Sequence, residues 1–332
     1  EERMASRPVW TSGVHDTLVA KRAMHGQAYG WEQPKWFVPD NWPLEDAHGW
    51  RRPGWYPAVR DECRAVRERV GVIDMTAFTK IDVTGRDAHR FLDHLTTGIV
   101  PKTVGRIALN YLLNEHGRIE TEVTISRLDE NTFYVISGPV GHGKDLDWLR
   151  QHTALPDAGD VDVTISDRTT EVATLVITGP NARPLFDAVT GADVSNEAFG
   201  FLTAQRLEID TSAGPVEVRA LRVGFSGSRG WELHMPMKQM AQVYRALWEA
   251  SDRLDLGLAD VGSHALNSLR MEKAYLTRFE LTHDIGPMQA GVERWVRPDK
   301  GDFVGRAALG NEPTGDEWRL VYLDVHVAYR QA

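Results

Sequence analysis

The sequence predicts an α+β protein that contains two related α/β subdomains with antiparallel sheets, and an internal repeat carries this prediction. Residues 81–96 and 175–190 align without a gap. Each copy runs from a β-branched strand through a glycine into a helix with apolar residues near i, i+3, i+4 and i+7. The two glycines, Gly85 and Gly179, lie 94 positions apart (179 − 85). That period is too long for a solenoid unit, so we expect two subdomains with a shared site between them.

Composition and charge restrict the class of protein. The 332 residues suffice for two or three packed domains, and a net charge of −9 argues against a nucleic-acid partner. Cys63 is the only cysteine, which excludes an internal disulfide and favours a reducing, cytoplasmic location. No apolar run reaches membrane-spanning length, so we expect no membrane partner. The chain begins with Glu rather than Met, and a fragment of a longer protein is one expectation.

We expect four segments along the chain. Residues 1–57 form an aromatic and proline-rich arm, residues 58–160 the first subdomain, residues 161–310 the second subdomain with a following helix, and residues 311–332 a short C-terminal β segment. The arm holds six of the 11 tryptophans, and its prolines interrupt any helix. We expect an irregular arm whose aromatic side chains pack either around its own domain or onto a domain absent from this chain.

Periodicity and turn residues predict the elements of each subdomain. In the first, we expect a helix over 58–70, a hairpin of 111–113 with 119–127, a strand over 132–137 and a helix over 145–152. In the second, we expect strands over 205–210 and 216–223, helices over 238–251 and 261–274, and a strand-like tail from residue 319.

Three common kinds of site find little support in the sequence. Residues 138–144 have the spacing of a phosphate-binding loop, but Asp145 stands where that loop needs Ser or Thr, which favours a plain glycine-rich turn. The 12 histidines form no pair at metal-binding spacing, and we expect no metal site. Cys63 lies on the apolar face of the 58–70 helix, which favours a buried thiol over a nucleophile.

Carboxylates are the more promising chemistry. Strand alternation places Glu120 and Glu122 on one face of the strand that begins at residue 119. Such a pair is often merely solvated. The second subdomain offers Glu232 just after a glycine turn, and pseudo-symmetry would bring Glu122 and Glu232 toward one cavity from opposite sides. Paired carboxylates suit a heterocycle whose N–H groups need acceptors.

Several motifs, in order over about residues 58–310, resemble the folate-dependent aminomethyltransferase family. That family includes the T-protein of the glycine cleavage system and the carboxyl-terminal half of dimethylglycine and sarcosine dehydrogenases. Residues 29–37 resemble the linker that joins the flavin-bearing half of the dehydrogenases to the folate-binding half. The matching stretches are Val83-Thr84-Gly85, Leu113 to Glu122, Gly224 to Leu233, Leu269 to Lys273 and Lys300 to Arg306.

The resemblance implies a cloverleaf of three domains around a central tetrahydrofolate site. It places the pterin's acceptor carboxylate on Glu232 and the carboxylate near the reacting folate nitrogens on Glu122, our candidate catalytic residue. The family usually has Asp at position 122 and Tyr at positions 109 and 225, where this chain has Leu109 and Phe225. Arg270 would pair either with a carboxylate of the ligand or with a neighbouring Glu. The predicted cofactor-binding set comprises Tyr111, Glu120, Phe225, Glu232, Arg270 and Tyr275.

The implied reaction is one-carbon transfer. A flavin site oxidises a small methylated amine of the dimethylglycine or sarcosine type, and tetrahydrofolate captures the released carbon as 5,10-methylene-tetrahydrofolate. FAD would lie only on a missing domain or partner subunit, because this chain has no dinucleotide-binding motif. One alternative is a non-catalytic folate-binding or scaffold module. The other is direct methyl transfer to tetrahydrofolate from a sulfonium or quaternary ammonium compound.

Overall fold

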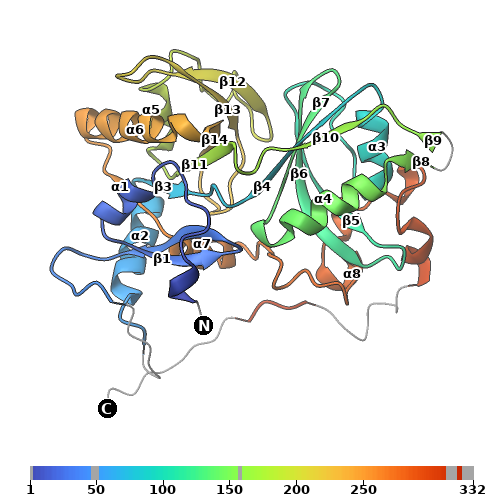
Figure 1. Cartoon of the computed structure of the whole chain (residues 1–332), viewed down its shortest axis with the longest axis horizontal. Coiled ribbons are helices and arrows are strands. Elements are labelled where there is room, and N and C mark those ends of the chain that lie inside the picture. Colours follow the sequence, from blue (N-terminus) through green and yellow to red (C-terminus); the bar gives the residue numbers. More distant parts are fainter. Residues whose placement is uncertain (1–2, 46–51, 156–158, 312–319, 324–332) are drawn as a thin grey trace.

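A computed structural model describes residues 3–45, 52–155, 159–311 and 320–323 of the chain. Two β-sheets lie at the centre of two lobes, which stand side by side in Figure 1. The first sheet has the strand order β10-β4-β7-β6-β5, and all its neighbours are antiparallel. Its strands are β4 (Thr79–Thr84), β5 (Ile107–Leu113), β6 (Ile119–Asp129), β7 (Thr132–Ser137) and β10 (Thr164–Asp167).

The second sheet repeats this order with one strand added. Its order is β12-β13-β14-β11-β3-β15, and only the edge pair of β15 with β3 is parallel. Its strands are β3 (Val70–Asp74), β11 (Val172–Thr178), β12 (Ala204–Ile209), β13 (Val216–Leu221), β14 (Gly230–Pro236) and β15 (Leu258–Asp260). The predicted mixed fold with largely antiparallel sheets is thereby confirmed.

The two sheets exchange one strand each. β3 precedes β4 in the chain but pairs with β11, and β10 precedes β11 but pairs with β4. Apart from that exchange, β4-β7-β6-β5 corresponds strand for strand to β11-β14-β13-β12. The predicted division at residues 160 and 161 therefore follows the repeat in sequence, while the sheets interlock across it.

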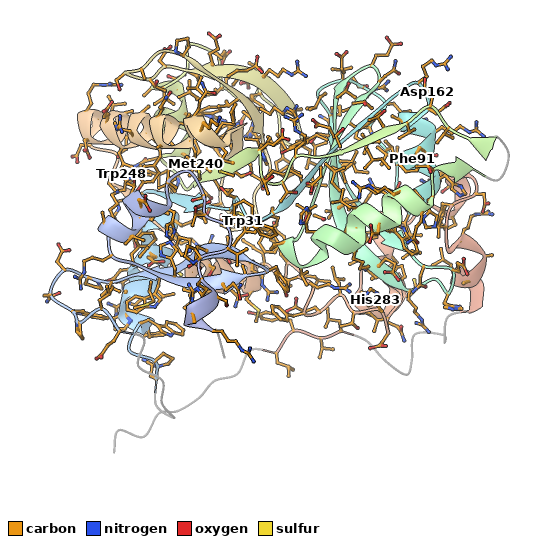
Figure 2. All side chains as sticks on the ribbon, in the orientation of Figure 1. Trp31, Phe91, Asp162, Met240, Trp248 and His283 are labelled. Atoms are coloured by element: carbon orange, nitrogen blue, oxygen red, sulfur yellow. The ribbon has the colours of Figure 1, made fainter. Side chains whose placement is uncertain are left out.

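Helices give each sheet its own apolar core. Against the first sheet pack α3 (Ala88–Leu95) and α4 (His142–Gln151), through residues that include Phe91 and Leu149. Against the second pack α5 (Ala182–Asp187) and α6 (Met240–Leu254), through residues that include Phe186 and Leu247. Figure 2 shows the labelled Phe91 and Met240 in opposite lobes. The repeated strand–glycine–helix units are thus the structural cores that the sequence predicts.

The N-terminal arm differs from its prediction in having regular secondary structure, and it packs on this chain, which is one of the two alternatives that the sequence left open. It contains α1 (His15–Ala20) and a hairpin of β1 (Ala23–Ala28) with β2 (Trp31–Phe37). The side chains of Leu18, Trp31 and Trp36 are buried, and Leu18 belongs to the core of the second sheet. The expectation of an irregular arm is therefore wrong. Burial of apolar surface against its own chain is what orders the segment.

Two long helices differ from their predicted bounds by a few residues. α2 (Tyr56–Glu68) ends earlier than expected, because Val70 already belongs to β3. α7 (Ser263–Met271) starts after Gly262 and packs beside α2 and β2. Cys63 lies half-buried on α2, and its thiol lies 3.7 Å from the Ala265 carbonyl oxygen, with which it hydrogen-bonds. Burial raises the pKa of this thiol, which is consistent with an unreactive cysteine.

The C-terminal part covers the β5–β6 hairpin of the first sheet. Short elements follow α7, among them α8 (Pro287–Ala290), and their apolar residues enclose Tyr111 and Ile119. Residues 320–323, the last described segment, contain no strand, whereas the rest of the predicted C-terminal β segment lies outside the described residues. The strands β8 (Ala154–Leu155) and β9 (Gly159–Asp160), each two residues long, pair in antiparallel orientation. None of the helices in the described part of the chain is long and apolar enough to cross a membrane.

Candidate functional site

Two of the predicted carboxylates project from the faces on which the sheets meet. Glu122 on β6 shares its face with Thr124, which lies opposite Ile136 of β7. Glu232 on β14 lies opposite Leu221 of β13. Both faces contribute to one apolar cluster between the sheets, whose buried members are Ile107, Tyr134, Ile136, Ala204 and Leu221. The fold therefore directs Glu122 and Glu232 toward the same region from different sheets.

Glu122 is held by a tyrosine of the neighbouring strand. Tyr111 lies directly opposite Glu122 in the β5–β6 ladder, and its hydroxyl donates a 2.6 Å hydrogen bond to Glu122 Oε2. Burial raises the pKa of the Glu122 carboxyl, and the hydrogen bond from Tyr111 opposes this shift. A buried carboxylate with a raised pKa is well suited to accept and release a proton.

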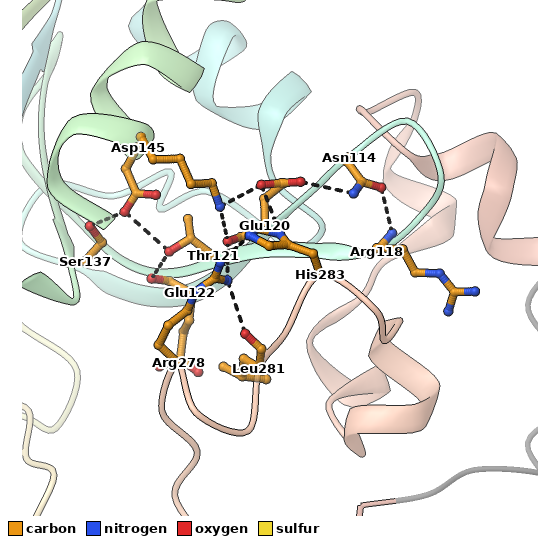
Figure 3. Close-up of polar contacts among 11 residues, drawn as sticks. Asn114, Arg118, Glu120, Thr121, Glu122, Ser137, Asp145, Arg278, Leu281 and His283 are labelled. Atoms are coloured by element: carbon orange, nitrogen blue, oxygen red, sulfur yellow. Dashed lines mark hydrogen bonds and ion pairs between the residues drawn. The ribbon is translucent and has the colours of Figure 1, made fainter. Parts of the chain in front are cut away.

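Glu120 is occupied by protein partners. Its carboxylate forms a 2.6 Å ion pair with Lys144, accepts a 3.0 Å hydrogen bond from Asn114 and lies 3.3 Å from His283 Nδ1. Figure 3 shows this group at the β6 strand, with Asn114 and His283 turned toward Glu120. The backbone carbonyl of Glu120 also accepts hydrogen bonds from Lys144 and Arg278. These partners make Glu120 a structural centre, whereas Glu122 on the same face has one side-chain partner among the described residues, Tyr111.

Glu232 is supported by a buried histidine on its own strand. His234 Nε2 lies 3.2 Å from Glu232 Oε2, and the Glu232 side chain retains 16% of its exposure. His234 itself is buried, which lowers its pKa and favours the neutral imidazole. One carboxylate oxygen of Glu232 is therefore engaged by the protein, while the other accepts no hydrogen bond from the described part of the chain.

The predicted pseudo-symmetry between Glu122 and Glu232 is wrong. Glu122 lies on β6, whose counterpart is β13, while Glu232 lies on β14, whose counterpart is β7. The registers of the repeated strands match Glu232 with Tyr134, since Val176 pairs with Glu232 and Asp82, 94 residues earlier, pairs with Tyr134. The repeat therefore does not relate the two carboxylates, which lie on the strand faces that contribute to the apolar cluster between the sheets.

The remaining predicted residues lie around α7. The Arg270 guanidinium is buried and makes two 3.0 Å hydrogen bonds to Glu280 Oε1 and a 2.8 Å bond to the Tyr275 carbonyl. Of the two partners that the sequence analysis left open for Arg270, the structure thus shows a neighbouring Glu, Glu280. Phe225 and Tyr275 stack with ring centroids 5.8 Å apart. Tyr275 remains 38% exposed, so this aromatic pair offers a flat surface.

Sequence reasoning missed a polar group beneath Glu232. Lys80 is fully buried, and its ammonium donates to the carbonyls of Thr76 and Phe78. Burial lowers the pKa of Lys80 to about 7. Tyr134 and Thr174 are also buried and contact His234. A polar alternation in β14, where His234 follows Glu232 by two positions, was the signal that could have identified His234.

These residues fit a ligand with several N–H donors. Glu122 and Glu232 each have one oxygen bound by a protein donor and a second oxygen that no described residue binds. Partly desolvated acceptors of this kind bind an aminopyrimidine edge or a protonated amine strongly, because the bonds are charge-assisted. Tetrahydrofolate carries an aminopyrimidine edge and further amine N–H groups that can donate hydrogen bonds. Its fit is therefore supported by the donor and acceptor chemistry of the site.

Comparisons with known proteins assign the family. Residues 14–300 match the family model described as the GCVT N-terminal domain. Mouse mitochondrial dimethylglycine dehydrogenase is 36% identical over 329 residues, which cover 98% of this chain and 37% of that protein. The mouse mitochondrial regulatory subunit of pyruvate dehydrogenase phosphatase is 30% identical over 330 residues, 96% of this chain and 37% of that protein. The chain thus spans little more than a third of the length of these relatives. Both relatives are named as mitochondrial, so the expected cytoplasmic location remains a prediction.

A solved structure supports the same fold. Aminomethyltransferase T of the glycine cleavage system from Bartonella henselae superposes with a TM-score of 0.73 over 91% of this chain and 74% of that chain. The sequence identity is 22%, so this likeness concerns the fold alone. Together with the family match, which extends over most of the chain, it completes the assignment. The chain belongs to the GCVT family of folate-dependent aminomethyltransferases and is related to one part of dimethylglycine dehydrogenase.

Proposed function

We propose that this chain captures the carbon released by oxidative N-demethylation of a methylated amine as 5,10-methylene-tetrahydrofolate. The observation that carries the proposal is the pair of carboxylates, Glu122 and Glu232, on the facing sides of two sheets, each with one oxygen that no described residue binds. The methylated amine would be of the dimethylglycine or sarcosine type, which the relationship to dimethylglycine dehydrogenase supports.

The residues of the chain would position the reactants and manage one proton. Tetrahydrofolate supplies two amine nitrogens that bond to the iminium carbon, and the demethylated amine leaves. Joining both nitrogens to one carbon releases a proton, which Glu122 would accept, and the ionised Glu122 would stabilise the iminium charge. Glu232 would accept N–H bonds from the aminopyrimidine edge of the pterin. The Phe225–Tyr275 pair would offer an aromatic surface beside the ligand.

The iminium would come from a flavin-bearing dehydrogenase domain or partner subunit. Oxidation of the N-methyl group removes two electrons, which FAD on that domain or subunit would accept. The length of mouse dimethylglycine dehydrogenase supports this arrangement, because the chain matches only 37% of it. The chain described here would then act on a product delivered by its neighbour.

Calorimetric titration with tetrahydrofolate tests the proposal. We expect the parent chain to bind, and Glu232→Ala to bind about ten- to a hundredfold more weakly, because charge-assisted hydrogen bonds contribute about 1.5–3 kcal/mol. Supplying formaldehyde with dimethylamine, which form an iminium in solution, should then yield methylene-tetrahydrofolate faster with the chain than without it. A chain that does not bind reduced folate, or a folded Glu232→Ala variant with unchanged affinity, would contradict the proposal.

A non-catalytic folate-binding module is the second candidate. Two points favour it: the chain has Leu109 and Phe225 where the resemblance implies Tyr, and one relative is named as a regulatory subunit. This candidate predicts folate binding with no acceleration of methylene-tetrahydrofolate formation. Direct methyl transfer from a sulfonium or quaternary ammonium donor would instead give methyl-tetrahydrofolate, which mass spectrometry distinguishes.

A further inference from the structure

His234 connects the two sheets at the position of Glu232. Its Nδ1 lies 3.1 Å from the Tyr134 hydroxyl of β7 and 3.0 Å from the Thr174 hydroxyl of β11. Its Nε2 lies 3.2 Å from Glu232 Oε2. The imidazole also packs edge-on against the Tyr134 ring, with centroids 5.3 Å apart. Three hydrogen-bonding groups, those of Tyr134, Thr174 and Glu232, therefore meet at one ring.

These contacts fix the tautomer of His234. A neutral imidazole has one donor nitrogen and one acceptor nitrogen. Glu232 offers only acceptor oxygens when it is ionised, so Nε2 must carry the hydrogen. Nδ1 is then the acceptor, and it faces two hydroxyl groups that can donate. Burial of the ring, which lowers its pKa, keeps the imidazole neutral, so the arrangement holds without a charge on His234.

We propose that His234 is the positioning residue for Glu232, which it holds through Nε2–H so that the second carboxylate oxygen faces the folate. This inference rests on the proposed function, because it assigns Glu232 to the pterin. Tyr134 and Thr174 orient the imidazole from two different strands, and strands β7 and β11 belong to different sheets. The geometry of the folate acceptor is therefore set by the contact between the sheets.

The charged neighbours leave this role to His234. Lys80 is buried near Glu232, but its ammonium donates hydrogen bonds to the carbonyls of Thr76 and Phe78. Arg219 pairs with Asp82 at 2.8 Å and lies over the Tyr134 ring. Among the described contacts, only His234 donates to the Glu232 carboxylate. Removing its N–H therefore frees Glu232 to rotate.

Two substitutions of His234 test the proposal, each measured by titration with tetrahydrofolate. His234→Leu fills similar space without an N–H, and we expect about tenfold weaker binding. His234→Gln retains a side-chain N–H near the place of Nε2, and we expect affinity within about threefold of the parent. A purely structural role for His234 would give both folded variants the same affinity, and that result would overturn the proposal.

A spectroscopic measurement decides the case if His234→Leu does not fold. In the intact chain labelled with 15N-histidine, His234 is assigned by the resonance that His234→Gln lacks. We expect the Nε2–H tautomer and a shift of the Nε2 resonance when tetrahydrofolate is added. Protonation at Nδ1, or a resonance that folate leaves unchanged, would overturn the proposal.

Failure of this inference is distinguishable from failure of the proposed function. If the parent chain does not bind tetrahydrofolate at all, the proposed function fails. If the parent binds, Glu232→Ala binds weakly and folded His234→Leu binds like the parent, then the folate site stands and the role of His234 is refuted.

Discussion

The Tyr111 hydroxyl donates a 2.6 Å hydrogen bond to Glu122 Oε2 across the β5–β6 ladder. This bond joins Tyr111, which the sequence analysis predicts to bind the cofactor, to Glu122, which it predicts to be catalytic. It also orients Glu122, since only one carboxylate oxygen remains for a ligand. Burial and this hydrogen bond act on the pKa of Glu122 in opposite directions.

Glu122→Gln should separate binding from transfer. The amide keeps the shape of the side chain but cannot accept the proton, so we expect nearly normal folate affinity and methylene-tetrahydrofolate formation about a hundredfold slower. Glu122→Asp should retain measurable activity. Glu120→Gln is the matched control from the same strand face, because Glu120 is occupied by Lys144 and Asn114. A loss of transfer rate with Glu120→Gln and not with Glu122→Gln would show that Glu120, and not Glu122, serves the transfer step.

Tyr111→Phe should move the pH dependence of the transfer rate. Burial raises the pKa of Glu122 and the Tyr111 bond lowers it, so loss of the hydroxyl raises this pKa further. Because the ionised carboxylate is the active form, the acidic limb of the profile should shift to higher pH by about one unit, the equivalent of one hydrogen bond. The pH–rate profile measures this shift. Tyr244→Phe, whose hydroxyl binds Asp260 instead, is the control and should leave the limb in place.

Trp36→Ala should destabilise the whole fold. Its side chain is buried in a core shared with α2 and α7, and loss of such a ring costs about 3–5 kcal/mol. Trp10→Ala is the control from the same arm, because that side chain is 39% exposed and should cost about 1 kcal/mol. Urea unfolding compares the two variants. A loss of unfolding free energy for Trp36→Ala that is no larger than the loss for Trp10→Ala would show that Trp36 contributes little to the core.

Glu62 should give the protein a pH-dependent stability. Its carboxyl accepts 2.8 Å bonds from the backbone N–H groups of Phe37 and Gly262, yet burial raises its pKa to about 7. The folded state therefore binds the proton more tightly than the unfolded state. Stability is highest below the unfolded pKa and falls as pH rises through the window that ends near pH 7.

The matching measurement compares Glu62→Gln with the parent chain at several pH values. The free energy of unfolding of the variant, relative to the parent, should increase across that window by up to about 3 kcal/mol, since the amide does not ionise. Glu249→Gln, an exposed position on α6, should show no such trend. A pH-independent difference for Glu62→Gln would mean that the carboxyl is ionised throughout.

Much of the fold was predictable because its signals are local. Alternation and turns in the sequence predict β5, β6 and β7, and the repeat predicts the paired strand–glycine–helix units. The motif that contains Glu122 identified the strand face on which that residue lies. The irregular structure expected for the arm was the main error, because its proline and tryptophan content does not report that β1 pairs with β2 and that β2 packs on α7.

The sequence by itself determined the two equivalent sheets, the family and the strands that carry Glu122 and Glu232. Only the tertiary structure decided which strands exchange, which carboxylates are engaged and how His234 supports Glu232. The exchange of β3 and β10 depends on hydrogen-bond partners distant in the chain, which no local pattern specifies. Likewise, Arg270 binds Glu280 and Glu120 binds Lys144 because folding brings those charges together, and burial then sets the pKa of Glu122.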